Sequence, residues 1–186
     1  MSNAVYTRRV FLGQTIFTAG AAAYVAGCKR PAPKAEMLSA EEAAVVTAMA
    51  EQIIPADQDP GATDLGVIHY IDRQLRRRHA KHFPLYRDGV AALQASSEGL
   101  HGKPFTALAW DEQTALLRML DSGSAPGDAW KSVPAQTFFK IVIDHTMQGF
   151  YGSPRHGGNL NFMSFKMLGL DMPDIIGQNR YEGGEG

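Results

Sequence analysis

Residues 134–152 read PAQTFFKIVIDHTMQGFYG, and this stretch decides the fold that we expect. Its apolar side chains recur at intervals of three and four residues, which is the spacing of one face of an α-helix. Pro134 suits the first turn of a helix, and Gly149 and Gly152 end the pattern. The members of the apolar stripe are Phe138, Phe139, Val142, Ile143, Thr146 and Phe150. The stretch therefore predicts a long amphipathic helix with one face in a core.

The same periodicity extends upstream. Ser39 and Glu42 have the spacing of a capping box, in which each side chain bonds to the other residue's backbone N–H, and they open a helix that Pro55 stops. A further helix is expected over residues 110–120, because acidic residues occupy its first turn and leucines recur along one face.

Two other helical stretches are less regular. The first is opened by Thr63 or Asp64 and runs into a basic segment, and the second covers residues 84–97 and is interrupted by Gly89. No strand alternation and no internal repeat stand out. The sequence predicts an all-α fold, a compact multi-helix domain over residues 39–176, followed by a glycine-rich, flexible tail over residues 177–186.

The basic segment reads RRRHAKH over residues 76–82. Cations suit the C-terminus of a helix, where they meet the negative end of the helix dipole. The alternative is a docking patch for an acidic partner or for lipid head groups. The sequence leaves both interpretations open.

Composition limits the classes of function. The chain has 186 residues, with 18 basic and 19 acidic side chains, so it lacks the basic excess of a nucleic-acid binder. A single cysteine excludes an intramolecular disulfide and a zinc site built from several thiolates. No dinucleotide or phosphate-binding glycine motif and no haem attachment motif is present, so we expect no catalytic residue, cofactor or metal in this chain.

The N-terminal segment has the features of an export signal. A short basic region precedes residues 10–27, which carry no charge and are mildly apolar. The signal residues are Arg8, Arg9, Phe11 and Leu12, and they resemble the twin-arginine motif, whose machinery moves folded proteins. Residues 1–27 are therefore expected to be a signal peptide.

The apolar segment ends in VAGC at residues 25–28, which looks like a lipobox with Cys28 as the lipidated residue. Two or more acyl chains would anchor the chain stably. The alternative is an uncleaved signal anchor with an unmodified cysteine. Residues 28–38, with two prolines, are expected to form an extended tether.

The stretch after the long helix is rich in glycine, which predicts a defined loop with positive φ angles. Asp144, His145 and His156 could be metal ligands or an acid–base pair, but two histidines with no third ligand in register are a weak metal signal. The other histidines, His79 and His82 among them, are expected to be scattered and exposed to solvent.

Several motifs together resemble the gluconate 2-dehydrogenase subunit 3 family over residues 38–173. Those in the C-terminal half begin with Phe138, Phe139 and Thr146, and they include GFYG at 149–152, PR at 154–155, GGN at 157–159 and FKMLG at 165–169. Those in the N-terminal half are LSAEE at 38–42, IIPAD at 53–57, GA at 61–62 and YIDRQL at 70–75.

The resemblance implies a small accessory subunit that is not itself catalytic. Such subunits pair with a large flavoprotein of the glucose-methanol-choline type that holds FAD, and often with a multi-haem cytochrome c subunit. The large subunit as a rule lacks an export signal, so a partner with Arg8 and Arg9 would escort it to the periplasm. The expected complex oxidises a sugar or polyol and is held at the membrane through Cys28.

The glycine-rich loop and the aromatic pair before it are the expected contact with the large subunit, because aromatic residues and arginine are favoured at interfaces. These residues are Phe150, Tyr151, Pro154, Arg155, His156, Gly157, Gly158 and Asn159. A self-contained structural loop is the alternative for them. For the whole chain, the alternatives are a stand-alone periplasmic lipoprotein enzyme and a small-molecule binding module using His145 and His156.

Overall fold

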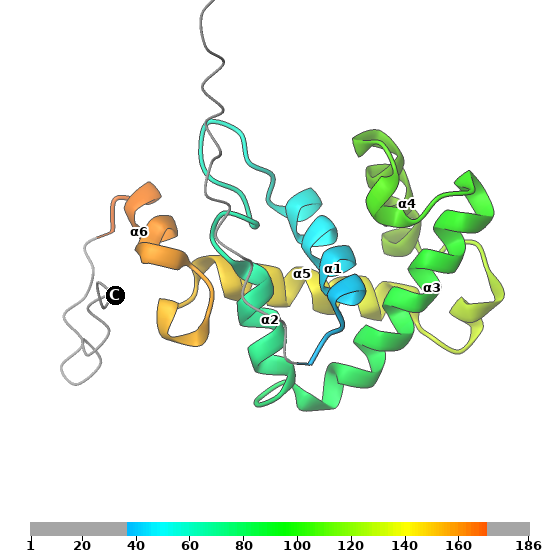
Figure 1. The fold of residues 1–186 in the computed structure, drawn as a ribbon, viewed down its shortest axis with the longest axis horizontal. Helices are drawn as coiled ribbons and strands as arrows, with labels where there is room; N and C mark the ends of the chain where they lie inside the picture. Colours follow the sequence, from blue (N-terminus) through cyan, green and yellow to red (C-terminus); the bar gives the residue numbers. More distant parts are fainter. Residues whose placement is uncertain (1–36, 171–186) are drawn as a thin grey trace, which may run out of the picture. The chain divides into compact units, whose positions relative to one another are not determined.

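One long helix, α5 (Ala135–Tyr151), organises the fold. The computed structural model describes residues 37–170, and within that range α5 contacts every other α-helix (Figure 1). These helices are α1 (Ala40–Ile53), α2 (Val67–Leu75), α3 (Phe83–His101), α4 (Trp110–Ser122) and α6 (Met163–Met167). The described residues contain no strand, which confirms the all-α prediction.

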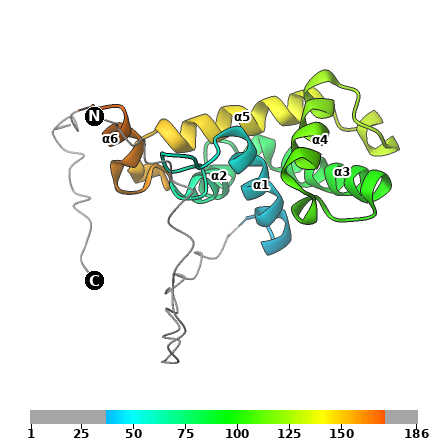
Figure 2. The ribbon, with the colours of Figure 1, turned by 90° about the horizontal axis from the view of Figure 1, so that it is seen from above.

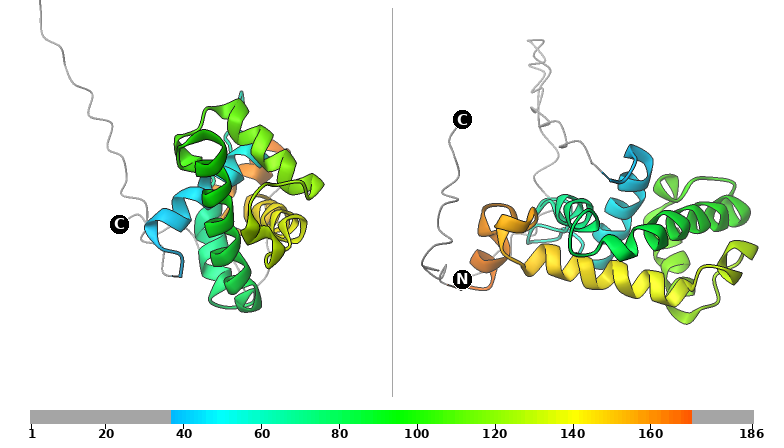
Figure 3. Two further views of the ribbon diagram at one scale, coloured as in Figure 1. Left: turned by 90° about the vertical axis from the view of Figure 1, so that its right-hand side faces the viewer. Right: turned by 90° about the horizontal axis from the view of Figure 1, so that it is seen from below.

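Short 3₁₀ helices make up most of the connections. They are η1 (Ala80–His82), η2 (Phe105–Ala107), η3 (Asp128–Lys131), η4 (Pro154–His156) and η5 (Leu160–Phe162). Seen from above and from below, α5 runs along one side of the domain and α1, α2, α3 and α4 pack against it (Figures 2 and 3). The predicted signal peptide, Cys28, most of the tether and the tail fall on residues 1–36 and 171–186, outside the described residues.

The start of the domain confirms the predicted capping box. The Ser39 hydroxyl accepts a hydrogen bond from the Glu42 N–H (3.1 Å), and the Glu42 carboxylate accepts one from the Ser39 N–H (2.8 Å). The buried carboxylate of Asp72 on α2 accepts hydrogen bonds from the N–H groups of Met37 and Leu38. The residues directly before α1 are thereby tied to α2.

The prediction that Gly89 interrupts the third helix is wrong. Helix α3 runs without a break from Phe83 to His101 and contains Gly89 in its buried face. A Cβ at this position would overlap the ring of Phe138 on α5. Gly89 is therefore a point of close approach between two helices, where the ring of Phe138 fills the space that a side chain would need.

Helix α2 ends earlier than its pattern suggests. The carbonyl oxygen of Gln74 accepts hydrogen bonds from the N–H groups of both Arg77 and His79, so the chain turns directly after Leu75. Residues 76–79 form this turn and lead into η1. The basic segment therefore lies beyond the helix, and the turn brings its histidines back toward α5.

The core is built from one face of each long helix. Its largest fully buried side chains include Met49, Ile71, Leu75, Tyr86, Leu93, Phe105, Leu116, Leu120, Phe138 and Phe150. Aromatic contacts join the faces, for example Tyr86 of α3 edge-on to Phe138 of α5 with ring centroids 6.1 Å apart. None of the helices in the described range is long and apolar enough to cross a bilayer.

Candidate functional site

The predicted contact loop is partly inside the domain. Phe150, Gly158 and Asn159 are buried, whereas Tyr151 and Arg155 are exposed and Pro154, His156 and Gly157 are half-buried. The φ angle of Gly157 is 109°, as the prediction of positive dihedral angles requires. The exposed members remain available for a partner, and the buried ones hold the loop in place.

Asn159 fixes the path of this loop. Its side-chain amide donates to the carbonyl oxygen of Gly152 (2.9 Å), and its side-chain oxygen accepts from the N–H of Ser164 (2.9 Å). Its φ angle is 47°, in the left-handed region that asparagine tolerates better than most residues. A Cβ at Gly158 would overlap the Gly149 carbonyl, so the loop packs directly on the backbone of α5. These contacts hold the loop against α5.

Basic residues gather beside the exposed part of the loop. The Arg73 guanidinium donates to the Arg155 carbonyl oxygen (3.1 Å), and Arg155 Nε donates to His156 Nε2 (3.0 Å). Desolvation, and then the positive charges of Arg155, Arg73, Arg78 and Arg77, lower the pKa of His156. The basic turn after α2 and η4 thus share one electrostatic environment.

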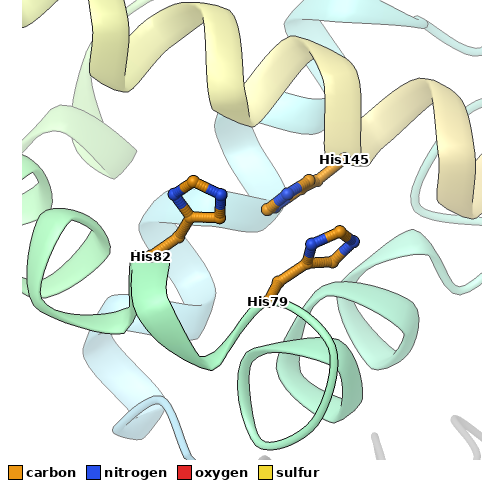
Figure 4. Close-up of side chains that lie close together, drawn as sticks. All are labelled: His79, His82 and His145. Atoms are coloured by element: carbon orange, nitrogen blue, oxygen red, sulfur yellow. The ribbon is translucent and has the colours of Figure 1, made fainter.

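Three histidines meet where the turn after α2 reaches α5. His79 precedes η1, His82 ends it, and His145 lies on the buried face of α5 (Figure 4). One ring nitrogen of each lies within 4.8 Å of those of the other two. The rings of His79 and His145 are stacked with centroids 4.1 Å apart, and His82 meets His145 edge-on at 5.6 Å. We call this group the histidine cluster.

Polar neighbours orient two rings of the histidine cluster. Nδ1 of His145 is hydrogen bonded to the hydroxyl of the buried Tyr86 on α3 (3.1 Å). Nε2 of His79 lies 3.2 Å from the side-chain oxygen of Gln148, which also accepts a hydrogen bond from the Tyr70 hydroxyl (2.7 Å). Because an amide oxygen is only an acceptor, the His79 contact requires a proton on Nε2 and leaves Nδ1 with its lone pair.

The pKa values of two histidines in the cluster are lowered. Burial, and then the neighbouring His79 and His82, lower the pKa of His145 to about 4. Desolvation, Lys81 and His79 lower the pKa of His82 in the same direction. A neutral imidazole is the form that accepts a proton or binds a metal ion through its free nitrogen.

The structure corrects the sequence analysis at these residues. His79 and His82 are only partly exposed, and they are gathered rather than scattered. The group that could hold a metal includes neither Asp144, which is exposed, nor His156. One signal could have found it: His145 follows Phe138 and Val142 in register on the buried face of α5, so its side chain had to be met by polar groups in the core.

A second feature is an exposed apolar surface at the C-terminal end of the described chain. Its members are Tyr151, Leu160, Met167, Leu168 and Leu170, with Leu168 57% and Leu170 53% exposed. They come from the end of α5, from η5 and from α6 and the residues after it, and α6 contacts both α5 and η5. We call this group the C-terminal apolar surface. Large exposed apolar side chains on neighbouring elements favour an interaction site.

Comparison with known proteins gives one match. The family model described as gluconate 2-dehydrogenase subunit 3 matches residues 40–171, which is more than half of the chain. No curated protein and no solved structure matches.

Proposed function

The chain belongs to the gluconate 2-dehydrogenase subunit 3 family, and from this premise we propose that it is the accessory subunit of a periplasmic, membrane-associated dehydrogenase that uses FAD. Family membership supports the coarser statement, a small subunit of a complex of the gluconate 2-dehydrogenase type. The proposed substrate class is a sugar or polyol, such as gluconate, glucose or a glycoside. The observation that carries the proposal is the match over residues 40–171.

In this proposal the redox chemistry belongs to partner subunits. A large flavoprotein of the glucose-methanol-choline type holds FAD and oxidises the substrate, and a multi-haem cytochrome c subunit passes the electrons onward. The accessory chain stabilises the flavoprotein and escorts it through export. Arg8 and Arg9 support the escort role, because the twin-arginine route accepts a cargo that is already folded. Lipidation of Cys28 would then hold the complex at the membrane.

The C-terminal apolar surface is the proposed contact with the flavoprotein. This surface contains Tyr151, and Arg155 follows four residues later in the chain. Both residues are exposed, and the sequence analysis expected both at an interface. Aromatic residues and arginine are enriched among the interface residues that contribute most of the binding free energy. Leu168 and Leu170, each more than half exposed, offer apolar area that a partner can cover.

A matched pair of substitutions tests this surface. Leu168→Asp would place a carboxylate in the proposed interface, and Leu100→Asp would place the same group on the last turn of α3, where Leu100 is 46% exposed. Burying an unpaired carboxylate is strongly unfavourable, so we expect Leu168→Asp to weaken the complex at least about tenfold. Leu100→Asp is expected to leave binding within about twofold.

The measurement is the amount of flavin and of FAD-dependent sugar dehydrogenase activity that copurifies with each tagged chain from the membranes of its own organism. Circular dichroism of both variants serves as the control for folding. Equal recovery with the two variants would contradict the proposed interface. Recovery of no flavoprotein with the unaltered chain would contradict the proposed function.

A further inference from the structure

We propose that His79, His82 and His145 form a binding site for one divalent transition-metal ion of the Zn²⁺ class. The site is separate from the C-terminal apolar surface, and the proposal does not depend on the flavoprotein partner. It rests on the convergence of three imidazoles from two parts of the sequence and on the hydrogen bonds that orient two of them.

The positions of the ring nitrogens are close to those that a metal requires. A tetrahedral Zn²⁺ ion with Zn–N bonds of 2.0–2.1 Å holds its ligand nitrogens about 3.4 Å apart. The nitrogens of the histidine cluster lie within 4.8 Å of one another. His79 and His82 are partly exposed and flank the short 3₁₀ helix η1, so rotation of their side chains can close the remaining distance. His145 is 3% exposed on a long helix and is the fixed member.

The surroundings of two rings match those of metal-binding histidines. Such a histidine usually engages its other ring nitrogen in a hydrogen bond, which sets the tautomer and the orientation of the ring. Gln148 does this for Nε2 of His79, and Tyr86 does it for Nδ1 of His145. The remaining nitrogens, Nδ1 of His79 and Nε2 of His145, are then the ligand atoms. The Tyr70 hydroxyl donates a hydrogen bond to the Gln148 side-chain oxygen and so helps to position the group that orients His79.

The donor set selects the class of metal. Three imidazoles without a carboxylate or a thiolate suit Zn²⁺, Cu²⁺ and Ni²⁺, whereas Mg²⁺ and Ca²⁺ require oxygen ligands. Within the described residues the group contains histidine only. Lys81 acts on the pKa of His82 and Arg78 on that of Tyr70, so positive charge is close by. This charge opposes a bare cation and favours an anionic fourth ligand, such as hydroxide or a carboxylate.

A bound ion would attach the turn after α2 to α5. Residues 76–82 are held at their start by the bonds from Arg77 and His79 to Gln74, and the metal would add a link from both ends of η1 to α5. Because the ion binds the folded state, it would also raise the melting temperature as its concentration rises.

The test uses the full chain carrying Cys28→Ala and no histidine tag, so that neither a thiol nor a tag supplies a ligand. Titration with ZnCl₂ in a calorimeter is expected to show one ion per chain and a higher melting temperature. His79→Ala and His82→Ala should each weaken binding at least about 100-fold, and Tyr86→Phe about 10- to 100-fold. The control variants His69→Ala and His101→Ala lie outside the cluster and should bind within about threefold of the parent.

A second measurement uses no substitution in the histidine cluster, so its result does not depend on whether the variants fold. The same parent chain is loaded with one equivalent of Cu²⁺, and pulsed electron paramagnetic resonance counts the imidazoles on the ion. Three coordinated imidazoles support the site, and any other number overturns it. No Zn²⁺ binding at 1 mM ZnCl₂, or binding that survives His79→Ala together with His82→Ala, also overturns it. A failed flavoprotein interaction would leave both readouts unchanged.

Discussion

At the scale of single residues, Glu51 links the end of α1 to the loop that follows. Its carboxylate accepts hydrogen bonds from the Thr63 hydroxyl and from the N–H groups of Ala56 and Thr63. Partial burial acts to raise the pKa of Glu51, but the hydrogen bonds from Thr63 and Ala56 outweigh it, so the pKa lies below its usual value of 4.5. The charged carboxylate therefore stabilises the folded state.

This carboxylate predicts a pH dependence of stability. Because its folded-state pKa is below its unfolded-state pKa, its contribution is complete above about pH 4.5 and is lost as the pH falls through the folded-state value. Glu51→Gln should lower the free energy of unfolding at pH 7 and make its decline toward pH 3 shallower. Urea unfolding between pH 7 and pH 3 measures both effects.

The control is Glu98→Gln, an exposed carboxylate on α3. It should leave the pH profile of the parent unchanged. If the free energy of unfolding falls equally steeply toward pH 3 in the parent and in Glu51→Gln, the stabilising role of the Glu51 carboxylate is contradicted.

Residue patterns in the sequence did not reveal the histidine cluster. Tyr151 and Arg155 are exposed, and their contact with a partner stays a prediction. The histidine cluster was missed because His79 and His82 follow three arginines, and such a segment is usually solvated. What brings them to His145 is the turn at Gln74, a tertiary arrangement that periodicity does not encode. The buried register of His145 was the available clue.

At the scale of elements, the packing of α3 on α5 depends on a residue without a side chain. Gly89 lets the ring of Phe138 lie against the α3 backbone, and that ring also contacts Tyr86 and Trp130. Gly99, in the last turn of the same helix, has open space where a Cβ would stand. Adding a Cβ at Gly89 therefore tests packing against α5, whereas adding one at Gly99 tests helix propensity alone.

Substitution by alanine should change the stability of the domain in opposite directions at the two glycines. Gly89→Ala forces Phe138 to move and is expected to destabilise the domain by about 1–3 kcal/mol. Gly99→Ala keeps all contacts and is expected to stabilise it by up to about 1 kcal/mol, because alanine favours the helix. Chemical unfolding of the two variants checks the difference, and a Gly89→Ala chain as stable as the parent would show that α3 does not depend on this contact.

The elements themselves were predictable where local signals dominate. The capping box of α1, the acidic first turn of α4 and the aromatic stripe of α5 all lie where the sequence indicates, because each depends on neighbours within one or two turns. Gly89 was misread as a break because glycine has a low helix propensity, and tertiary packing overrides that preference.

At the scale of the whole molecule, the described domain and the N-terminal segment have different proposed tasks. The domain carries the C-terminal apolar surface, which is the proposed contact with a partner, and the histidine cluster, which is the proposed metal site. In the proposal, the N-terminal segment would supply Arg8 and Arg9 for export and Cys28 for anchoring. The proposed protein is therefore an escort, and the oxidation is assigned to its cargo.

Export of the flavoprotein tests this account most directly. In the source organism, the chain is replaced by a version with Arg8→Lys and Arg9→Lys, which keeps both charges but removes the planar guanidinium groups. FAD-dependent sugar dehydrogenase activity is then measured in periplasm, membrane and cytoplasm. We predict that periplasmic and membrane activity falls at least about tenfold and that active flavoprotein accumulates in the cytoplasm. Folded, active flavoprotein in the periplasm of these cells, at the level of the unaltered strain, would contradict the escort function.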